Sequence, residues 1–142
     1  MLREKACGHV RQCEVRIANS SYRPLSSADA LQSELQKLFS QTLAIQDPFE
    51  AAVYVHCNLA YLQFFEDCNK RVARLMQSAL LVANNLTPLF LQDNRIPDYW
   101  DAIVSYYETG DYSLYKKLFF EQYTQTLSWF TGRSPKQAKA PL

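Results

Sequence analysis

The sequence predicts an all-α fold with one small β-hairpin, on three observations. Apolar residues recur at helical spacing in several separate segments. Helix start and stop signals bound these segments, as at Asp47-Pro48 and at Gly110. Only residues 14–17 alternate between polar and apolar in the manner of a strand. The chain has 142 residues, 48% of them hydrophobic, so one globular domain with its own core is expected.

The first regular elements are an expected hairpin and a helix. Residues 14–17 alternate like a strand and residues 18–21 are turn formers, which predicts a small hairpin or extended flap. Ser26 is then predicted to cap a helix that ends near Ile45. Its apolar residues fall on one helical face, so this helix is expected to pack against the core by that face alone.

A second helix is predicted to begin at Asp47-Pro48, where the carboxylate caps and the proline takes the first helical position. Residues 51–62 are almost continuously apolar, so this helix is expected to be central and buried on most sides. Residues 63–71 then break the pattern with a polar and aromatic mixture. A long helix with an apolar stripe follows and is expected to end near Asn84-Asn85.

Two more helices are predicted in the C-terminal half. Pro97 is expected to open the first, which Gly110 ends, and Asp111 to start the second. The tyrosines and phenylalanines of residues 99–130 could form a stacking stripe, but their helical spacing predicts that they are core. From Thr131 onward the chain is polar and contains proline, so residues 131–142 are expected to form a disordered tail behind a domain of residues 1–130.

Composition argues against several classes of partner. The net charge of +1 and the pI near 7.6 provide no overall field for nucleic acid. No stretch reaches the roughly 18 apolar residues of a spanning helix, and the N-terminus lacks the apolar core of a signal peptide, so no membrane partner is expected. The four cysteines form no Cys-x-x-Cys pair, which argues against zinc and disulfides and favours a reducing, cytoplasmic location.

The irregular segment of residues 63–74 has the composition of a phosphate site. It leads into a helix, and a helix N-terminus offers unpaired N–H groups and partial positive charge to anions. Arg71 and Arg74 stand one turn apart, so both guanidinium groups can face one ligand. Asp67 adds a carboxylate of the kind that holds Mg²⁺ against phosphates. Charged residues at a helix start are also common as caps and solvated ions, so this pattern alone leaves both interpretations open.

Residues 63–74 read Gln-Phe-Phe-Glu-Asp-Cys-Asn-Lys-Arg-Val-Ala-Arg. They resemble the Fic-family motif His-Pro-Phe-x-Asp/Glu-Gly-Asn-Gly/Lys-Arg-x-x-Arg, with the phenylalanine, acid, asparagine, lysine and both arginines in register. Residues 52–62 resemble the family's preceding helix, and residues 16–24 resemble its flap. Gly8 and Arg11 stand where the family often has a Gly-x-x-Arg lead-in. The resemblance implies the all-α Fic (Fido) helical fold with a small β-hairpin flap.

The resemblance also implies an activity, the transfer of AMP from ATP to a hydroxyl of a target protein. Asp67 would hold Mg²⁺, Asn69 would fix the loop and contact the α-phosphate, and Phe65 would anchor the loop in the core. Arg71 and Arg74 would bind the distal phosphates. The implied nucleotide-binding residues are Asp67, Cys68, Asn69, Lys70, Arg71 and Arg74. The implied flap, which would hold the target protein as an added strand, consists of Arg16, Ile17, Ala18, Asn19, Ser20, Ser21 and Tyr22.

Three departures from the motif bear on activity. Gln63 stands where the family has its catalytic histidine, and a positioned base is worth about 10²–10⁴-fold in rate. Cys68 replaces the first glycine, which is costly if that position needs positive φ. Lys70 replaces the second glycine and resembles the Doc branch, whose members can phosphorylate. His56, two turns before Gln63, is expected to be a packed core residue rather than a substitute base.

Three functions therefore stay open. The first is an adenylyltransferase-type protein that binds ATP and Mg²⁺, with transfer impaired or altered by the loss of the histidine. The second is an inactive Fic-fold module that holds a partner on the flap or regulates an active paralogue. The third is Doc-like transfer of another phosphate group. The family core usually begins before the flap, so a missing N-terminal segment or a regulatory partner is also expected to complete the fold.

Overall fold

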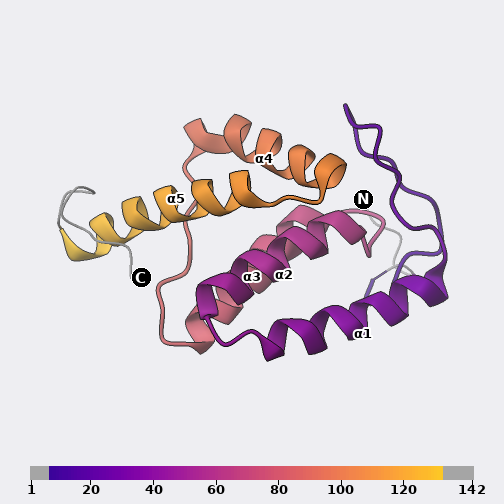
Figure 1. Ribbon diagram of the computed structural model, residues 1–142, viewed down its shortest axis with the longest axis horizontal. Coiled ribbons are helices and arrows are strands. Elements are labelled where there is room, and N and C mark those ends of the chain that lie inside the picture. Colours follow the sequence, from indigo (N-terminus) through magenta and orange to yellow (C-terminus); the bar gives the residue numbers. More distant parts are fainter. Residues whose placement is uncertain (1–6, 133–142) are drawn as a thin grey trace.

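The structure, a computed structural model, describes residues 7–132 and consists of helices joined by short connections (Figure 1). The α-helices are α1 (Ala28–Ala44), α2 (Pro48–Leu62), α3 (Asn69–Ala83), α4 (Ile96–Thr109) and α5 (Ser113–Thr131), with a short 3₁₀ helix η2 (Asp93–Arg95) before α4. The predicted all-α class is confirmed. None of the helices in residues 7–132 has the length and apolar composition needed to span a membrane.

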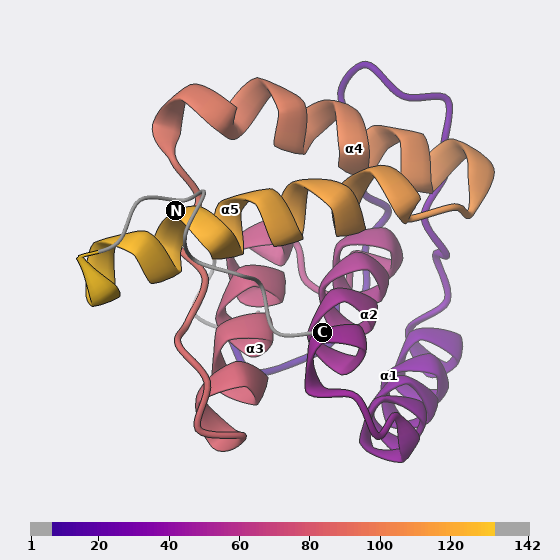
Figure 2. The ribbon, with the colours of Figure 1, turned by 60° about the vertical axis from the view of Figure 1, so that its left-hand side comes forward.

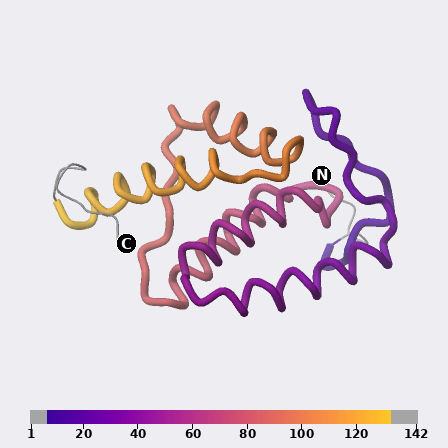
Figure 3. Tube along the Cα trace, viewed as in Figure 1, coloured from indigo at the N-terminus to yellow at the C-terminus, as the bar shows by residue number. Residues whose placement is uncertain are grey.

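Helix α2 is the centre of the fold and contacts each of the other four α-helices. It runs antiparallel to α3, with α1 on one side and the α4–α5 pair on the other (Figures 1 and 3). The view in Figure 2 shows α2 and α3 side by side beneath α4 and α5. Most residues of α2 are buried, as the continuous apolar run predicts. Asp47 accepts the N–H groups of Phe49 and Glu50, which confirms the predicted cap.

Two helix starts differ slightly from the prediction. Ser27, not Ser26, caps α1, because its hydroxyl accepts the N–H of Ala30 at 3.3 Å. Helix α4 begins at Ile96, which places Pro97 inside the first turn, where proline is tolerated. Both differences lie within the one or two residues by which local signals fix a helix end.

The last helix starts later and runs further than predicted. Asp111 lies before α5 and accepts the N–H of Ser113 at 2.8 Å, so it forms the turn that precedes the helix. Thr131 is the last residue of α5 rather than the start of a tail, and Gly132 ends the helix in the left-handed conformation. Residues 133–142, which make up the rest of the predicted tail, lie outside the described residues.

The predicted β-hairpin is not formed, since residues 7–132 contain no strand. Residues 14–17 form no regular element and a turn follows at residues 18–19, but the two arms are not paired. An isolated two-stranded hairpin is marginal in water. The second arm packs on the helices instead, where the ring of Tyr22 stacks on Tyr61 with centroids 4.4 Å apart. Its hydroxyl donates to the carbonyl of Tyr61 at 2.9 Å.

His56 is a core residue, as predicted. It is fully buried, and its ring stacks on Tyr115 with centroids 4.4 Å apart and planes 8° apart. Its Nε2 atom lies 3.2 Å from the hydroxyl of Tyr99. Burial, followed by the positive charge of Arg74, lowers the pKa of His56 to about 3. The imidazole is therefore neutral at physiological pH and ties α2 to α4 and α5.

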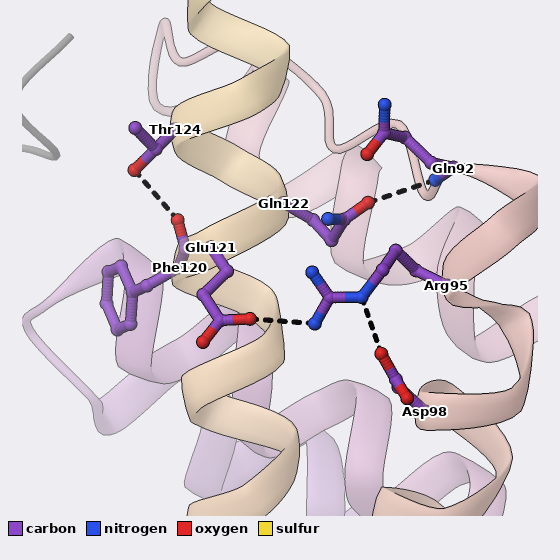
Figure 4. A network of polar contacts seen from close by, with 7 residues as sticks. All are labelled: Gln92, Arg95, Asp98, Phe120, Glu121, Gln122 and Thr124. Atoms are coloured by element: carbon purple, nitrogen blue, oxygen red, sulfur yellow. Dashed lines mark hydrogen bonds and ion pairs between the residues drawn. The ribbon is translucent and has the colours of Figure 1, made fainter. Parts of the chain in front are cut away.

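Helices α4 and α5 are joined by an ion-pair network on the surface (Figure 4). Arg95 donates from Nε to Asp98 at 2.6 Å and from Nη2 to Glu121 at 2.7 Å. The main-chain N–H of Gln92 donates to Oε1 of Gln122 at 3.0 Å. These contacts hold residues 92–98, where α4 begins, against the middle of α5.

Candidate functional site

A cleft of about 530 Å³, called here the main cleft, lies where the N-terminal segment, the loop after α2, α3 and α4 meet. It is lined by Val15, Arg16, Ile17, Ala18, Gln63, Glu66, Asp67, Cys68, Asn69, Lys70, Arg71, Arg74, Ile96, Tyr99 and Trp100. Segments far apart in the sequence therefore meet at one hollow, and all the implied nucleotide-binding residues lie on its wall.

The loop between α2 and α3 is bounded by two residues in the left-handed conformation. Gln63 has φ 50° and ends α2, and Cys68 has φ 70° at the start of α3. Residues other than glycine adopt this region at a cost of about 1–2 kcal/mol. Cys68 thus stands at a position that favours glycine, and its side chain makes no capping hydrogen bond.

Asn69 holds the loop closed from within. Its Oδ1 accepts the N–H of Phe65 at 2.9 Å, and its Nδ2 donates to the carbonyl of Phe65 at 2.7 Å. The same Nδ2 lies 3.2 Å from Oε1 of Gln63. Asn69 is 7% exposed, so these bonds are sheltered from water. Asn69 therefore fixes the loop through these hydrogen bonds, while its contact with the α-phosphate stays a prediction.

The anchoring of the loop in the core differs from the expectation. Phe65 is only half-buried, although it packs against the core. The fully buried residue is Phe64, at the position where the motif has proline. Both rings therefore pack against the core, and the motif comparison named only the less buried of the two.

The side chain of Gln63 is engaged in the structure of the loop. Its Nε2 donates to the carbonyl of Ala60 at 2.6 Å, and its Oε1 accepts from Asn69. Gln63 is 8% exposed. An amide has no useful basicity, and this one already bonds both to α2 and to the first residue of α3. The position of the motif histidine is thus occupied by a side chain that links α2 to α3 through hydrogen bonds.

Arg11 ties the N-terminal segment to the loop. Its main-chain N–H donates to the carbonyl of Phe64 at 2.8 Å, and its Nε donates to the carbonyl of Gln63 at 2.5 Å. The guanidinium also donates to the carbonyls of Cys13 and Leu25. Burial lowers the pKa of Arg11, yet three carbonyl groups surround its charge. The sequence placed Arg11 in a lead-in without assigning it these contacts.

Asp67 has the properties of a ligand for Mg²⁺, an ion that phosphate groups also bind. Its carboxylate accepts the N–H of Cys68 at 2.6 Å and lies 3.4 Å from Nη2 of Arg71. The hydrogen bond from Cys68, and then the charge of Arg71, lower the pKa of Asp67, so it is ionised at neutral pH. The described residues hold no group of three or more metal-ligating side chains. One exposed carboxylate fits Mg²⁺, which takes most of its ligands from phosphates and water.

Two cations of the main cleft lie over aromatic rings. The Nζ atom of Lys70 is 4.3 Å from the ring centre of Trp100, and burial lowers the pKa of Lys70. Arg74 lies with Cζ 5.8 Å from the ring centre of Tyr99. Within residues 7–132 Arg74 makes no ion pair or hydrogen bond, so its guanidinium has no competing anion. Sequence reasoning did not assign Trp100 to the site and placed it only among the apolar residues of the predicted helix.

Comparison with known proteins identifies the architecture. A family model described as Fic/DOC family matches residues 2–81, which is more than half of the chain. The chain belongs to the Fic/DOC family. Among solved structures it is similar to Fic-1 (residues 134–508) from C. elegans, with a TM-score of 0.76 and 20% identity. That match covers 90% of this chain and 38% of the worm chain, so this chain spans well under half of its length. A search of curated proteins finds no match.

The flap of this Fic domain divides between the main cleft and the helices. Arg16, Ile17 and Ala18 line the cleft. The remaining implied flap residues, Asn19, Ser20, Ser21 and Tyr22, do not. Ser20 donates to Glu108 of α4 at 3.1 Å, which fixes the far arm. No main-chain group of residues 14–18 makes a hydrogen bond to any other described residue, so this arm is an unpaired edge.

Proposed function

We propose that this Fic domain binds the triphosphate of ATP in the main cleft and is of the type that transfers AMP to a hydroxyl of a target protein. We further propose that transfer is impaired or altered because Gln63 replaces the base. One observation supports this most strongly: the start of α3 brings Lys70, Arg71 and Arg74 to the wall of one cleft, where Asp67 also lies.

The phosphate end of the proposed site is the first turn of α3. Its N–H groups have no partner within the helix, and the helix dipole adds partial positive charge. Arg71 is exposed, and its one partner among residues 7–132 is Asp67 at 3.4 Å, a pair that phosphate oxygens can displace. Arg74 has no anionic partner among the described residues and lies one turn further along the helix. Two guanidinium groups and a helix N-terminus together offer the positive charge and hydrogen-bond donors that bind the oxygens of an oligophosphate.

Asp67 would hold Mg²⁺ against the phosphate chain. When bound, Mg²⁺ would neutralise phosphate charge and polarise the phosphorus centre. For this, the carboxylate would turn from Arg71 toward the cleft, and Arg71 would then bind phosphate in place of Asp67. The long 3.4 Å contact and the exposure of both side chains make that exchange inexpensive.

The other end of the main cleft is apolar and suits a ring. Ile96, Tyr99 and Trp100 line it, and Trp100 is 44% exposed. A nucleobase would stack on Trp100 and gain about 1–3 kcal/mol, as bases do on aromatic side chains. Lys70 now covers this ring, so it would move toward the phosphates when a base enters.

The target protein would dock along residues 14–18 as an added strand. Their main-chain groups make no hydrogen bond to other residues of the described part of the chain, and residues 15–18 lie on the cleft wall. Main-chain hydrogen bonds would supply affinity with little demand on the sequence of the target. A target hydroxyl carried on that strand would reach the phosphate end of the cleft.

A second candidate is an inactive binding module, and the geometry of Gln63 favours it. The amide is bonded to Ala60 and Asn69 and has no basicity, so nothing at that position takes the hydroxyl proton. The same cleft and flap would then bind a nucleotide or a partner without reaction. Lys70 favours a third candidate, Doc-like transfer of another phosphate group.

Calorimetric titration with ATP and Mg²⁺ tests the binding step. Wild-type protein is expected to bind, and Arg71→Ala is expected to bind about tenfold more weakly, as for loss of one charged hydrogen bond. Lys37→Ala is the matched control, since Lys37 is exposed on α1 and outside the cleft. Absence of ATP binding to the wild-type protein would overturn the proposal.

Labelled ATP separates the three candidates. With the label on the α-phosphate, Gln63→His is expected to raise transfer to protein by about 10²–10⁴-fold if only the base is missing. Transfer of label only from the γ-phosphate identifies phosphoryl transfer. If both proteins bind ATP and neither transfers label, the binding module is the correct function.

A further inference from the structure

A second and more enclosed cavity lies next to the main cleft. It measures about 150 Å³ and is called here the inner cavity. It lies between α3, α5, the start of α4 and the segment of residues 89–91, and it shares Arg74 and Tyr99 with the main cleft. Most of its wall is apolar, formed by side chains such as Leu89, Leu118 and Phe119. Engineered apolar cavities of about 150 Å³ accept a benzene molecule.

Two buried amides line the inner cavity, and each already uses its oxygen. The hydroxyl of Tyr115 donates to Oε1 of Gln77 at 2.6 Å, and the main-chain N–H of Gln92 donates to Oε1 of Gln122 at 3.0 Å. Gln77 is 1% and Gln122 is 2% exposed. Since a main-chain N–H needs an acceptor, the orientation of the Gln122 amide is fixed by Gln92. Figure 4 shows the Gln122 nitrogen on the side away from Gln92.

The nitrogen of each amide is therefore an unused donor. Neither Nε2 atom has a hydrogen-bond partner among residues 7–132. Both nitrogens are reachable by solvent, because the fully buried side-chain atoms without a partner in this part of the chain are His56 Nδ1 and the hydroxyl of Tyr107. Arg74 adds a guanidinium that has no anionic partner among the described residues, none of which is an acidic residue on the cavity wall. The polar edge thus offers donors and positive charge, while the rest of the wall is apolar.

We propose that the inner cavity binds a small organic carboxylate whose apolar part is a single ring or a branched alkyl group. Its carboxylate would accept from Gln77, Gln122 and Arg74, which gives both amide nitrogens an acceptor and pairs the guanidinium. Its apolar part would fill the space beside Leu118 and Phe119. Water satisfies donors of this kind elsewhere in proteins, but it gains nothing from the apolar remainder of this wall.

Arg74 makes the inner cavity a regulatory site for the main cleft. A carboxylate bound there holds the guanidinium on its own side, and so removes one of the cations that the phosphates would use. This consequence rests on the proposed function, whereas binding of the carboxylate does not. Because coupling between two sites is reciprocal, ATP would weaken the carboxylate by the same factor.

Sodium benzoate is the probe for binding, with toluene as a probe that lacks the carboxylate. Titration of the full chain, followed by NMR, is expected to give contacts from the benzoate ring to the methyl groups of Leu89 and Leu118. Gln122→Glu keeps the acceptor for Gln92 and is expected to weaken benzoate by at least about tenfold. Gln32→Glu, on the exposed surface of α1, is the control for the added charge. Leu91→Phe, which fills the cavity without a charge, is expected to abolish binding of both probes.

The outcomes separate clearly. Ring contacts with Leu89 and Leu118 that are lost in Gln122→Glu and kept in Gln32→Glu support the site. No benzoate binding, equal binding of toluene, or full binding to Leu91→Phe overturns it. A separate titration of ATP at saturating benzoate is expected to show weaker ATP binding. If ATP does not bind at all, the proposed function fails and the carboxylate site stands; if benzoate binds and leaves ATP affinity unchanged, the coupling through Arg74 is wrong.

Discussion

The Nε atom of Arg11 donates to the main-chain carbonyl of Gln63 over 2.5 Å, and this bond joins the segment before the flap to the loop of the Fic motif. The main chain of Arg11 adds a second bond, to Phe64. Arg11, which is buried, thus connects the N-terminal segment to the loop between α2 and α3, and both segments contribute to the wall of the main cleft. Geometry on one side of the cleft depends on packing on the other.

Arg11→Lys is expected to lower the free energy of unfolding by about 2–3 kcal/mol, because carbonyl groups of Gln63, Cys13 and Leu25 lose a charged, partly buried donor. Urea unfolding measures the change. Arg16→Lys is the control, since Arg16 is exposed on the flap. A loss below about 0.5 kcal/mol would mean that the contacts of Arg11 contribute little to stability.

Cys68→Gly is expected to raise the free energy of unfolding by about 1 kcal/mol. Cys68 has φ 70°, and relief of that strain exceeds the entropy that glycine adds to the unfolded chain. Thermal unfolding measures it. Cys68→Ala is the matched control, since it removes the thiol and keeps the Cβ atom, and it is expected to bring no gain. Equal effects of both variants would place the cause in the thiol and not in the backbone.

The buried His56 is expected to make stability fall as the pH is lowered. Its pKa is about 3 in the folded protein and about 6.5 when unfolded, so only the unfolded state takes up a proton between these values. Its contribution is fully present above pH 6.5 and is lost as the pH falls toward 3. The slope is about 1.4 kcal/mol per pH unit.

Urea unfolding between pH 7 and pH 4 checks this, with His56→Gln compared with wild type. The variant is less stable at pH 7, and its curve is expected to be flatter over this range. His9→Gln is the control, because His9 is exposed. Parallel curves for wild type and His56→Gln would contradict the assignment of the proton to His56.

The pair of Arg95 with Glu121 is expected to stabilise the contact between α4 and α5 by about 0.5–1 kcal/mol, given its 2.7 Å separation and partial exposure. A double-mutant cycle of Arg95→Gln and Glu121→Gln measures the coupling in low salt. The coupling should shrink in 1 M salt, where charges are screened over about 3 Å. A coupling unaffected by salt would indicate that packing, rather than charge, joins the two residues.

Local chemistry was enough to predict the helices. Asp47-Pro48 begins α2 and Gly110 ends α4 because capping and backbone freedom act within one turn. The continuous apolar run predicted the central position of α2, since only a helix covered on most sides buries such a surface. The order of residues 67–74 likewise predicted a phosphate site at the start of a helix, because all its groups lie within two turns.

What the sequence left undecided depends on contacts between distant residues. Residues 14–17 have a strand pattern, but the stacking of Tyr22 on Tyr61 decided that the two arms stay apart. The bonds of Arg11 to Gln63 span 52 positions, and no local pattern announces them. The inner cavity exists only where α3, α4 and α5 meet. Sequence by itself determined which helices form and which residues are candidates to bind phosphate, since those depend on neighbours along the chain. Tertiary structure decided how the motif residue Gln63 is used and where the inner cavity lies, because packing brings those groups together.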